Sequence, residues 1–189
     1  MSLNQGIAEL PQKTIHPPKK MWPTSHKALI DENSKLKDEV CFDHLTGIYN
    51  RRYLDHQLSL MSTSGDIHGA TIFMLDIDNF KNFNEMGGHA NGDKKLQEVA
   101  SALTGLFHAT DLVARYGGDE FTIVLANITD PDIVQNIAFR LKEAMEEKNI
   151  YISFGFASAN KSDEEQIDFH KILDKADIEL KRMKEYKHL

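Results

Sequence analysis

Residues 115–121 read Arg-Tyr-Gly-Gly-Asp-Glu-Phe and lie between two short apolar runs, 112–114 and 122–125. Two β-rich runs joined by a Gly-Gly step predict a hairpin, because glycines supply the positive φ angles that a tight turn needs. Two acids directly after that turn, Asp119 and Glu120, repel each other unless a divalent cation neutralises them. The stretch therefore predicts either a cation-binding turn or an ordinary exposed hairpin tip.

A second acidic cluster, Asp76 and Asp78, favours the cation-binding interpretation. It follows the apolar run 70–75, which reads as a buried central strand. We expect this strand to pair with the strand that enters the hairpin, so that Asp76 and Asp119 converge at one edge of the sheet. Two carboxylates beside a free backbone carbonyl form a hard-oxygen site suited to Mg²⁺ that holds phosphates.

The segment after this strand offers further phosphate contacts. Asp78 is expected to begin a short helix, 78–85, whose N-terminal N–H groups could cradle a phosphate. Lys81 lies one turn inside that helix. Each residue also has an ordinary interpretation, Asp78 as a helix cap and Lys81 as a solvated surface lysine.

The composition excludes several classes of protein. The 189 residues carry 22 basic and 29 acidic side chains, a net charge of −7, which argues against a general nucleic-acid-binding surface. The single cysteine, Cys41, excludes an internal disulfide framework and is typical of a reducing cytoplasm. No apolar run approaches the roughly 18–20 residues that span a bilayer, and no secretory signal is visible. We therefore expect a cytoplasmic protein without membrane insertion and without a nucleic-acid partner.

Three segments are expected along the chain. Residues 1–24 are polar and punctuated by prolines, which predicts a flexible N-terminal segment. Residues 25–42 show a helical, heptad-like pattern that predicts a linker or signalling helix. This helix would either pair with another copy or pack on the domain, and an upstream sensor or partner would act through it. Residues 43–189 form the main domain.

The main domain is predicted to alternate helices and strands. Helices are expected over 51–61, 78–85, from Asp93 onward, 131–148 and 168–187, and strands over 70–75, the two arms of 112–126, and 151–157. Asn50 and Pro131 are expected to start helices, and Gly155 indicates a close backbone approach. The order is that of a split-βαβ α+β fold, ferredoxin-like or nucleotidyl-cyclase-like. We expect a mixed, mostly antiparallel sheet of about five strands flanked by helices, with the helices on one face.

Five motifs occur in one order along the chain. They are Asp43-x-Leu-Thr-Gly-x-x-Asn-Arg-Arg52, Asp76-Ile-Asp-x-Phe-Lys-x-x-Asn84, Gly88-His-x-x-Gly-Asp93, the stretch 115–121, and Ala176-Asp177. With these motifs the chain resembles the GGDEF domains, which are typically diguanylate cyclases, and the resemblance makes 43–189 the GGDEF catalytic domain. It implies condensation of two GTP into cyclic di-GMP with release of two pyrophosphates. Each subunit of a homodimer would hold one GTP.

The resemblance also implies roles in metal binding and catalysis. Asp76, the carbonyl of Ile77 and Asp119 would be the metal ligands, and the cofactor would be Mg²⁺ or Mn²⁺, two ions per active site. Asp119, Glu120 and Lys81 would be the catalytic residues. Either acid would accept the 3′-hydroxyl proton, and Lys81 would contact phosphate.

Substrate contacts follow from the same resemblance. Asn84 and Asp93 would read the guanine edge, whose N1–H and N2–H₂ are donors that a carboxylate accepts. The remaining substrate contacts would come from His89, Gly117, Gly118 and Lys184.

Two single positions and the C-terminal three residues depart from the family pattern. Glu85 stands where Asp is usual, and Lys181 stands where Tyr is usual. Residues 187–189, Lys-His-Leu, replace the usual Gly-Arg-Asn ending, so a second phosphate-binding cation is missing or weakened to His188.

Two other functions compete with the cyclase. One is a catalytically weak GGDEF module that binds GTP or cyclic di-GMP as a regulatory or interaction domain. The other is a purely structural dimerisation domain, which leaves the Asp76 and Asp119 pair unexplained. Degenerate members of the family usually lose the signature acids, whereas this chain keeps them, which favours the cyclase.

Overall fold

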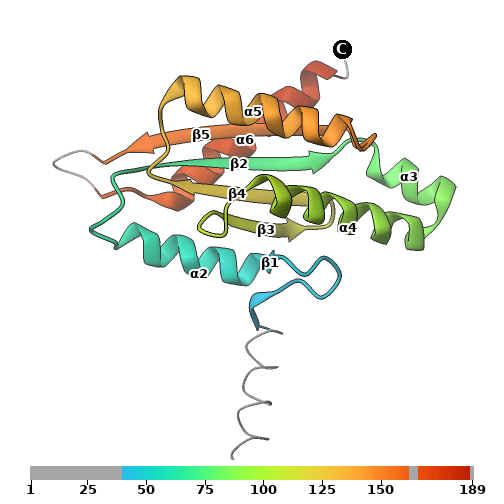
Figure 1. The fold of residues 1–189 in the computed structure, drawn as a ribbon, viewed down its shortest axis with the longest axis horizontal. Coiled ribbons are helices and arrows are strands. Elements are labelled where there is room, and N and C mark those ends of the chain that lie inside the picture. The colour runs from blue at the N-terminus through green and yellow to red at the C-terminus, as the bar shows by residue number, and fades with distance from the viewer. Residues whose placement is uncertain (1–39, 162–165, 188–189) are drawn as a thin grey trace, which may run out of the picture. The chain divides into compact units, whose positions relative to one another are not determined.

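The computed structural model describes residues 40–161 and 166–187. The predictions for residues 1–24 and for most of the 25–42 helix lie outside these residues. The described elements are β1 (Tyr49–Asn50), α2 (Arg51–Ser62), β2 (Gly69–Ile77), α3 (Phe80–Gly87), α4 (His89–Leu106), β3 (Leu112–Gly117), β4 (Glu120–Ala126), α5 (Pro131–Glu146), β5 (Ile152–Asn160) and α6 (Phe169–Lys187) (Figure 1). None of the described helices is long and apolar enough to cross a membrane.

The described strands form one five-stranded sheet in the order β1-β3-β4-β2-β5. β1 pairs in parallel with β3, whereas β3 with β4, β4 with β2, and β2 with β5 all pair antiparallel. The predicted mixed, mostly antiparallel sheet of an α+β fold is therefore confirmed.

One predicted strand pairing was wrong. β2 pairs with β4, the second strand of the hairpin, whereas we expected it to pair with β3, the first strand. Five successive residues of β4 are buried, so this strand needs a neighbour on each side and lies between β3 and β2. The register places Asp76 opposite Glu120, and the N–H of Ile77 donates to the carbonyl of Asp119 at 3.3 Å. The end of β2 and the hairpin turn thus meet through the other arm of the hairpin.

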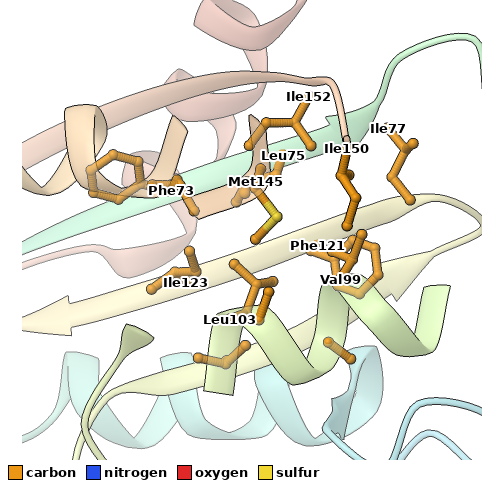
Figure 2. Packing of buried hydrophobic residues seen from close by; sticks show 14 of the residues in the cluster. Phe73, Leu75, Ile77, Val99, Leu103, Phe121, Ile123, Met145, Ile150 and Ile152 are labelled. Atoms are coloured by element: carbon orange, nitrogen blue, oxygen red, sulfur yellow. The ribbon is translucent and has the colours of Figure 1, made fainter. Parts of the chain in front are cut away.

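Helices cover both faces of the sheet, whereas we expected them on one. All nine residues of β2 are buried, and alternate residues of a strand point to opposite faces, so both faces need a cover. In Figure 1, α4 and α5 cross in front of the sheet and α6 passes behind it. Figure 2 shows the first core, where Leu103 of α4 and Met145 of α5 pack with Ile123 of the sheet. The second core joins α2 and α6 to the opposite face through residues such as Leu58 and Leu173.

Local side-chain chemistry explains where two helices begin. Asn50 caps α2, since its side-chain oxygen accepts the N–H of Tyr53 at 2.9 Å. Its amide nitrogen also donates to the carbonyls of Val40 and Phe42, at 2.9 and 3.1 Å, which fastens the entering chain. Pro131 is the first residue of α5. Both predicted helix starts are confirmed.

The junction of α3 and α4 is tighter than predicted. α4 begins at His89 rather than at Asp93, so one residue, Gly88, separates the two helices. Gly88 has a φ of +79°, a left-handed conformation that ends α3. Gly87 and Gly92 both lie within helices.

Gly155 allows α6 to lie directly against β5. A Cβ atom at this position would lie 2.1 Å from the backbone nitrogen of Leu180 and 2.4 Å from the carbonyl oxygen of Ala176. No side chain fits within such distances without moving the helix away from the sheet. The predicted close backbone approach is therefore confirmed.

Gly155→Ala should lower the free energy of unfolding by about 1–3 kcal/mol, because the added methyl group overpacks the contact between β5 and α6. Gly65→Ala is the matched control, since nothing lies within 4 Å of a Cβ added there. Urea denaturation of both variants measures the difference. Equal stability of the two would contradict the close packing at Gly155.

Candidate active site

The signature turn consists of Gly118 and Asp119, so Asp119 lies within the turn and not after it. β3 ends at Gly117, β4 begins at Glu120, and these two residues face each other in the ladder. Gly118 has a φ of +53°, whereas Gly117 does not have a positive φ. One left-handed glycine, and not the expected two, makes the turn. Asp119 and Glu120 are both half-buried.

Arg115 fastens the turn to the start of the domain. Its Nε and one Nη donate to the carbonyl of Gly118 at 3.0 and 2.7 Å. Its other Nη donates to the carboxylate of Asp43 at 3.0 Å. The same carboxylate accepts the N–H and the hydroxyl of Thr46 at 3.0 and 2.7 Å. The sequence placed Asp43 and Arg115 in motifs but assigned them no role, because their contact joins segments far apart in the chain.

Asp76 and Glu120 face α6 from neighbouring strands. They are opposite each other in the register, on the same face as Ile72 and Met74, which pack in the core beneath α6. Asp76 is 7% exposed, and the Nζ of Lys184 lies 2.5 Å from its Oδ2. The structure thus brings together three residues that the sequence nominated.

The carboxylates of this cluster repel one another when they are ionised. Burial raises the pKa of Asp76, the hydrogen bond from Lys184 opposes that shift, and the charges of Asp119 and Asp78 add to it. Burial also raises the pKa of Glu120, and the charges of Asp76 and Asp119 add to this rise. The cluster contains four carboxylates, those of Asp76, Asp78, Asp119 and Glu120, and two lysines, Lys184 paired with Asp76 and Lys187 paired with Asp78. A local excess of negative charge on hard oxygen atoms is the property that a divalent-cation site requires.

The helix predicted to begin at Asp78 begins later. α3 begins at Phe80, after Asn79 in a left-handed conformation with a φ of 57°. The backbone N–H of Asp78 donates to the carbonyl of Tyr151 at 2.9 Å, which continues the contact with the neighbouring strand beyond β2. This hydrogen bond holds the backbone of Asp78 beside Tyr151, and the helix begins two residues later.

Lys187 and Ser153 also contribute to the site, although the sequence had not indicated a role for either. The carboxylate of Asp78 accepts the hydroxyl of Ser153 and the Nζ of Lys187, both at 2.6 Å. Lys187 also donates to the carbonyl of Ile152 at 3.0 Å. The available signal was the spacing of Lys184 and Lys187, because residues three apart share one face of a helix. Lys187 is one of the departures from the family pattern.

Two hollows adjoin opposite faces of α3. The larger, about 780 Å³, is lined by residues that include Asp76, Asp78, Lys184 and Lys187. The smaller, about 450 Å³, is lined by Phe80, Lys81, Asn84, Glu85, His89 and Asp119. Six of the nominated residues are therefore divided between two hollows: Asp76 and Lys184 line the larger, and Lys81, Asn84, His89 and Asp119 line the smaller.

Three of the nominated residues that carry a side chain are exposed, as are Gly117 and Gly118. Lys81 is exposed and lies 4.0 Å from Glu85 on its own helix. His89 and Asp93 are exposed on the first turns of α4, and Asp93 lines neither of the two hollows. Lys181, a departure from the family pattern, forms an ion pair with Asp177 on α6.

A family model described as the diguanylate cyclase GGDEF domain matches residues 40–188. The chain belongs to the GGDEF family. Relatives of this GGDEF chain include Diguanylate cyclase A of Treponema denticola, 34% identical over 147 residues, and the response regulator PleD of Caulobacter vibrioides, 38% identical over 103 residues. These alignments cover 70% and 53% of this chain, but only 39% and 22% of the relatives. The chain thus spans less than half the length of these relatives.

Solved structures agree with the fold. The coiled coil and GGDEF domain of DgcB from Caulobacter crescentus, in complex with c-di-GMP, superposes with a TM-score of 0.73 at 24% identity, covering 84% of this chain and 88% of that one. A microbial GGDEF domain studied for its interaction with bis-(3,5)-cyclic di-GMP superposes with a TM-score of 0.68 at 29% identity, covering 79% and 93%. The similarity to DgcB concerns the fold alone.

The site suits a divalent cation in the chemistry of its donors. Among the residues that the structure describes, no group of three or more His, Cys, Asp or Glu side chains is placed to hold a metal ion. A cation at Asp76 and Asp119 would therefore need further oxygen ligands from the backbone or from nucleotide phosphates. Carboxylates in a locally anionic, partly buried position fit such an ion.

Asp43→Asn should lower the free energy of unfolding by about 1–3 kcal/mol at neutral pH, because it leaves Arg115 without its charged partner. Burial alone would raise the pKa of Asp43, but hydrogen bonds from Thr46 and Arg115 outweigh it, and the pKa lies below the ordinary value of 3.8. A lowered pKa in the folded chain stabilises it above that ordinary value, and the stabilisation is lost as the pH falls through the folded pKa.

Urea denaturation at pH 7 and at a series of pH values below 4 measures this effect. The difference between wild type and Asp43→Asn should be largest at pH 7 and should shrink in acid. Asp55→Asn is the control, since Asp55 forms an exposed ion pair with Arg51 at 3.9 Å and should matter little. A difference that is independent of pH would contradict the ion-pair account.

Proposed function

We propose that this GGDEF domain is a diguanylate cyclase, which condenses two GTP into cyclic di-GMP and releases two pyrophosphates. The observation that carries the proposal is the cluster of Asp76, Asp119 and Glu120 around the signature turn. These three carboxylates lie close together although they repel one another electrostatically. Groups held in mutually unfavourable charge states are typical of functional sites. Relatives that bear the name diguanylate cyclase support the same assignment.

The reaction joins two nucleotides through two equivalent substitutions. The 3′-oxygen of one GTP forms a bond to the α-phosphorus of the other, the bond from that phosphorus to pyrophosphate breaks, and the hydroxyl proton leaves. Asp119 or Glu120 accepts the proton. Mg²⁺ or Mn²⁺, two ions per site, would neutralise phosphate charge and acidify the attacking hydroxyl. Asp76, the carbonyl of Ile77 and Asp119 would hold these ions.

Lysines of α6 and α3 would bind the phosphates. Lys184 pairs with Asp76 at 2.5 Å. A cation held by the Asp76 carboxylate would compete with Lys184 for it, and the ammonium group would then be free to pair with a phosphate oxygen. Lys81 is exposed beside the smaller hollow and reaches the same region from α3.

Base recognition would lie between α3 and α4, with further substrate contacts from His89, Gly117 and Gly118. Asp93 accepts hydrogen bonds from the N1–H and N2–H₂ groups of guanine, and Asn84 supplies an amide beside it. One domain would hold one GTP, so turnover needs two domains facing each other in a homodimer. Residues 25–42 would align the two domains and would receive the signal of an upstream sensor or partner.

Asp119→Asn should reduce cyclic di-GMP formation by at least about a hundredfold, because it removes a charge aimed at the reacting phosphates without changing side-chain size. Incubation with GTP and Mg²⁺, followed by chromatographic identification of the products, provides the measurement. Asp76→Asn should behave alike, and the double variant should lose no more than the single ones, because both act through the same ions.

Asp174→Asn, at an exposed position on α6, is the control and should retain full activity. Urea denaturation should show that all variants remain folded. A folded wild-type chain that forms no cyclic di-GMP, or an unimpaired Asp119→Asn variant, would contradict the proposed function.

GTP should bind at least about tenfold more tightly than ATP, because adenine has no N1–H or N2–H₂ donor for the carboxylate of Asp93. Competition against a fluorescent GTP analogue in the presence of Mg²⁺ measures both affinities. Asp93→Asn should reduce the preference, whereas Asp132→Asn, at an exposed position on α5, should leave it unchanged. Equal affinities in the wild type would refute the assignment of Asp93.

A further inference from the structure

Two asparagine–glycine contacts cross the junction between α3 and α4. A Cβ atom added to Gly92 on α4 would lie 1.8 Å from the Oδ1 of Asn84 on α3. In the reverse direction, a Cβ atom added to Gly87 on α3 would lie 2.8 Å from the Nδ2 of Asn91 on α4. Each asparagine therefore occupies the space that a side chain on the facing helix would fill.

The two contacts differ in hydrogen bonding. The Nδ2 of Asn91 donates to the carbonyl of Gly87 at 2.7 Å, so this contact stabilises the junction by itself. The Oδ1 of Asn84 is buried and has no hydrogen-bond partner among the described residues. A buried acceptor without a partner is unfavourable. Stability alone therefore does not explain why the amide of Asn84 occupies this position.

Gly92 is itself unfavourable for the helix that contains it. It lies in the first turns of α4, is buried, and does not have a positive φ, so the backbone does not need a glycine there. Alanine is the better helix former at such a position. The three atoms nearest to a Cβ added at position 92 all belong to the amide of Asn84, which would have to shift to admit a side chain there.

The place of this contact connects it to nucleotide binding. Asn84 lines the smaller hollow together with Lys81, His89 and Asp119, and Gly92 directly precedes Asp93. Seating the amide oxygen against Gly92 fixes the plane of the amide, so its remaining polar group, the NH₂, has one orientation relative to the hollow. Fixing a recognition group before the ligand arrives reduces the entropy lost on binding.

We propose that Gly92 is a positioning residue for base recognition: the notch left by its missing side chain orients the amide of Asn84 toward the purine. This inference rests on the proposed function, because it assumes that GTP binds at the α3–α4 junction. Gly92 acts through Asn84 and does not contact the nucleotide. Enlarging residue 92 should therefore impair the same step as deleting the amide.

Gly92→Ala, Asn84→Ala and the double variant test the inference by GTP and ATP binding in the presence of Mg²⁺. Gly92→Ala should weaken GTP binding at least about tenfold and reduce the preference for GTP over ATP, as should Asn84→Ala. The double variant should bind like Asn84→Ala alone, because truncating the asparagine frees the space that the methyl group added at position 92 needs. Gly105→Ala on the same helix, where nothing lies within 4 Å of an added Cβ, should leave binding unchanged.

Gly155→Ala serves as a second control, because it disturbs the contact of α6 with the sheet and not the α3–α4 junction. Any loss of phosphate binding should affect GTP and ATP equally and leave the ratio of their affinities unchanged. Normal GTP binding by Gly92→Ala, or a double variant whose loss equals the product of the two single losses, would overturn the inference. If Gly92→Ala does not fold, the double variant is the deciding test. A double variant that does not fold, or that binds GTP more weakly than Asn84→Ala, then overturns the inference. A wild-type chain without GTP binding overturns the proposed function and this inference together.

Discussion

The backbone of α6 rests directly on β5 at Gly155, and the arrangement of the site depends on this contact. The close approach leaves no room for a side chain, so the height and direction of α6 over the sheet are determined there. Its last turns then carry Lys184 to Asp76 and Lys187 to Asp78, each at the end of β2. A helix held farther from the sheet by a larger residue would withdraw both ammonium groups from the two carboxylates.

The signature turn is held from the opposite side by Arg115. One guanidinium group binds the carbonyl of Gly118 and the carboxylate of Asp43, so the turn that presents Asp119 is joined to the first residues of the domain. Such a fork of hydrogen bonds is rigid, because the guanidinium is planar and always charged. The turn is thereby held in place while its acids remain in an electrostatically unfavourable cluster. Favourable interactions around the site thus offset unfavourable ones within it, which is common at functional sites.

Much of the local structure could be predicted from the sequence. The caps and starts of helices at Asn50 and Pro131, the buried strand that ends at Asp76, and the close approach at Gly155 follow from the chemistry of single residues and their immediate neighbours. The proximity of Asp76 and Asp119 could also be predicted, because Asp76 lies at the end of an apolar strand and Asp119 lies in the turn between two other strands of the same sheet. The α3–α4 boundary could not, because Gly87, Gly88 and Gly92 look alike in sequence, and only packing across the junction keeps Gly92 helical.

By itself, the sequence determined the fold class and the hairpin, because these follow from local periodicity and turn chemistry. The residues proposed to bind a cation, a phosphate and a base were assigned from the family motifs. Only the tertiary structure decided that β2 pairs with β4, that helices cover both faces, and that Lys187 contacts Asp78 and Arg115 contacts Asp43. Each of these joins segments far apart in the chain. Which partner a segment selects depends on the free energy of packing the whole sheet, and no local pattern records that sum.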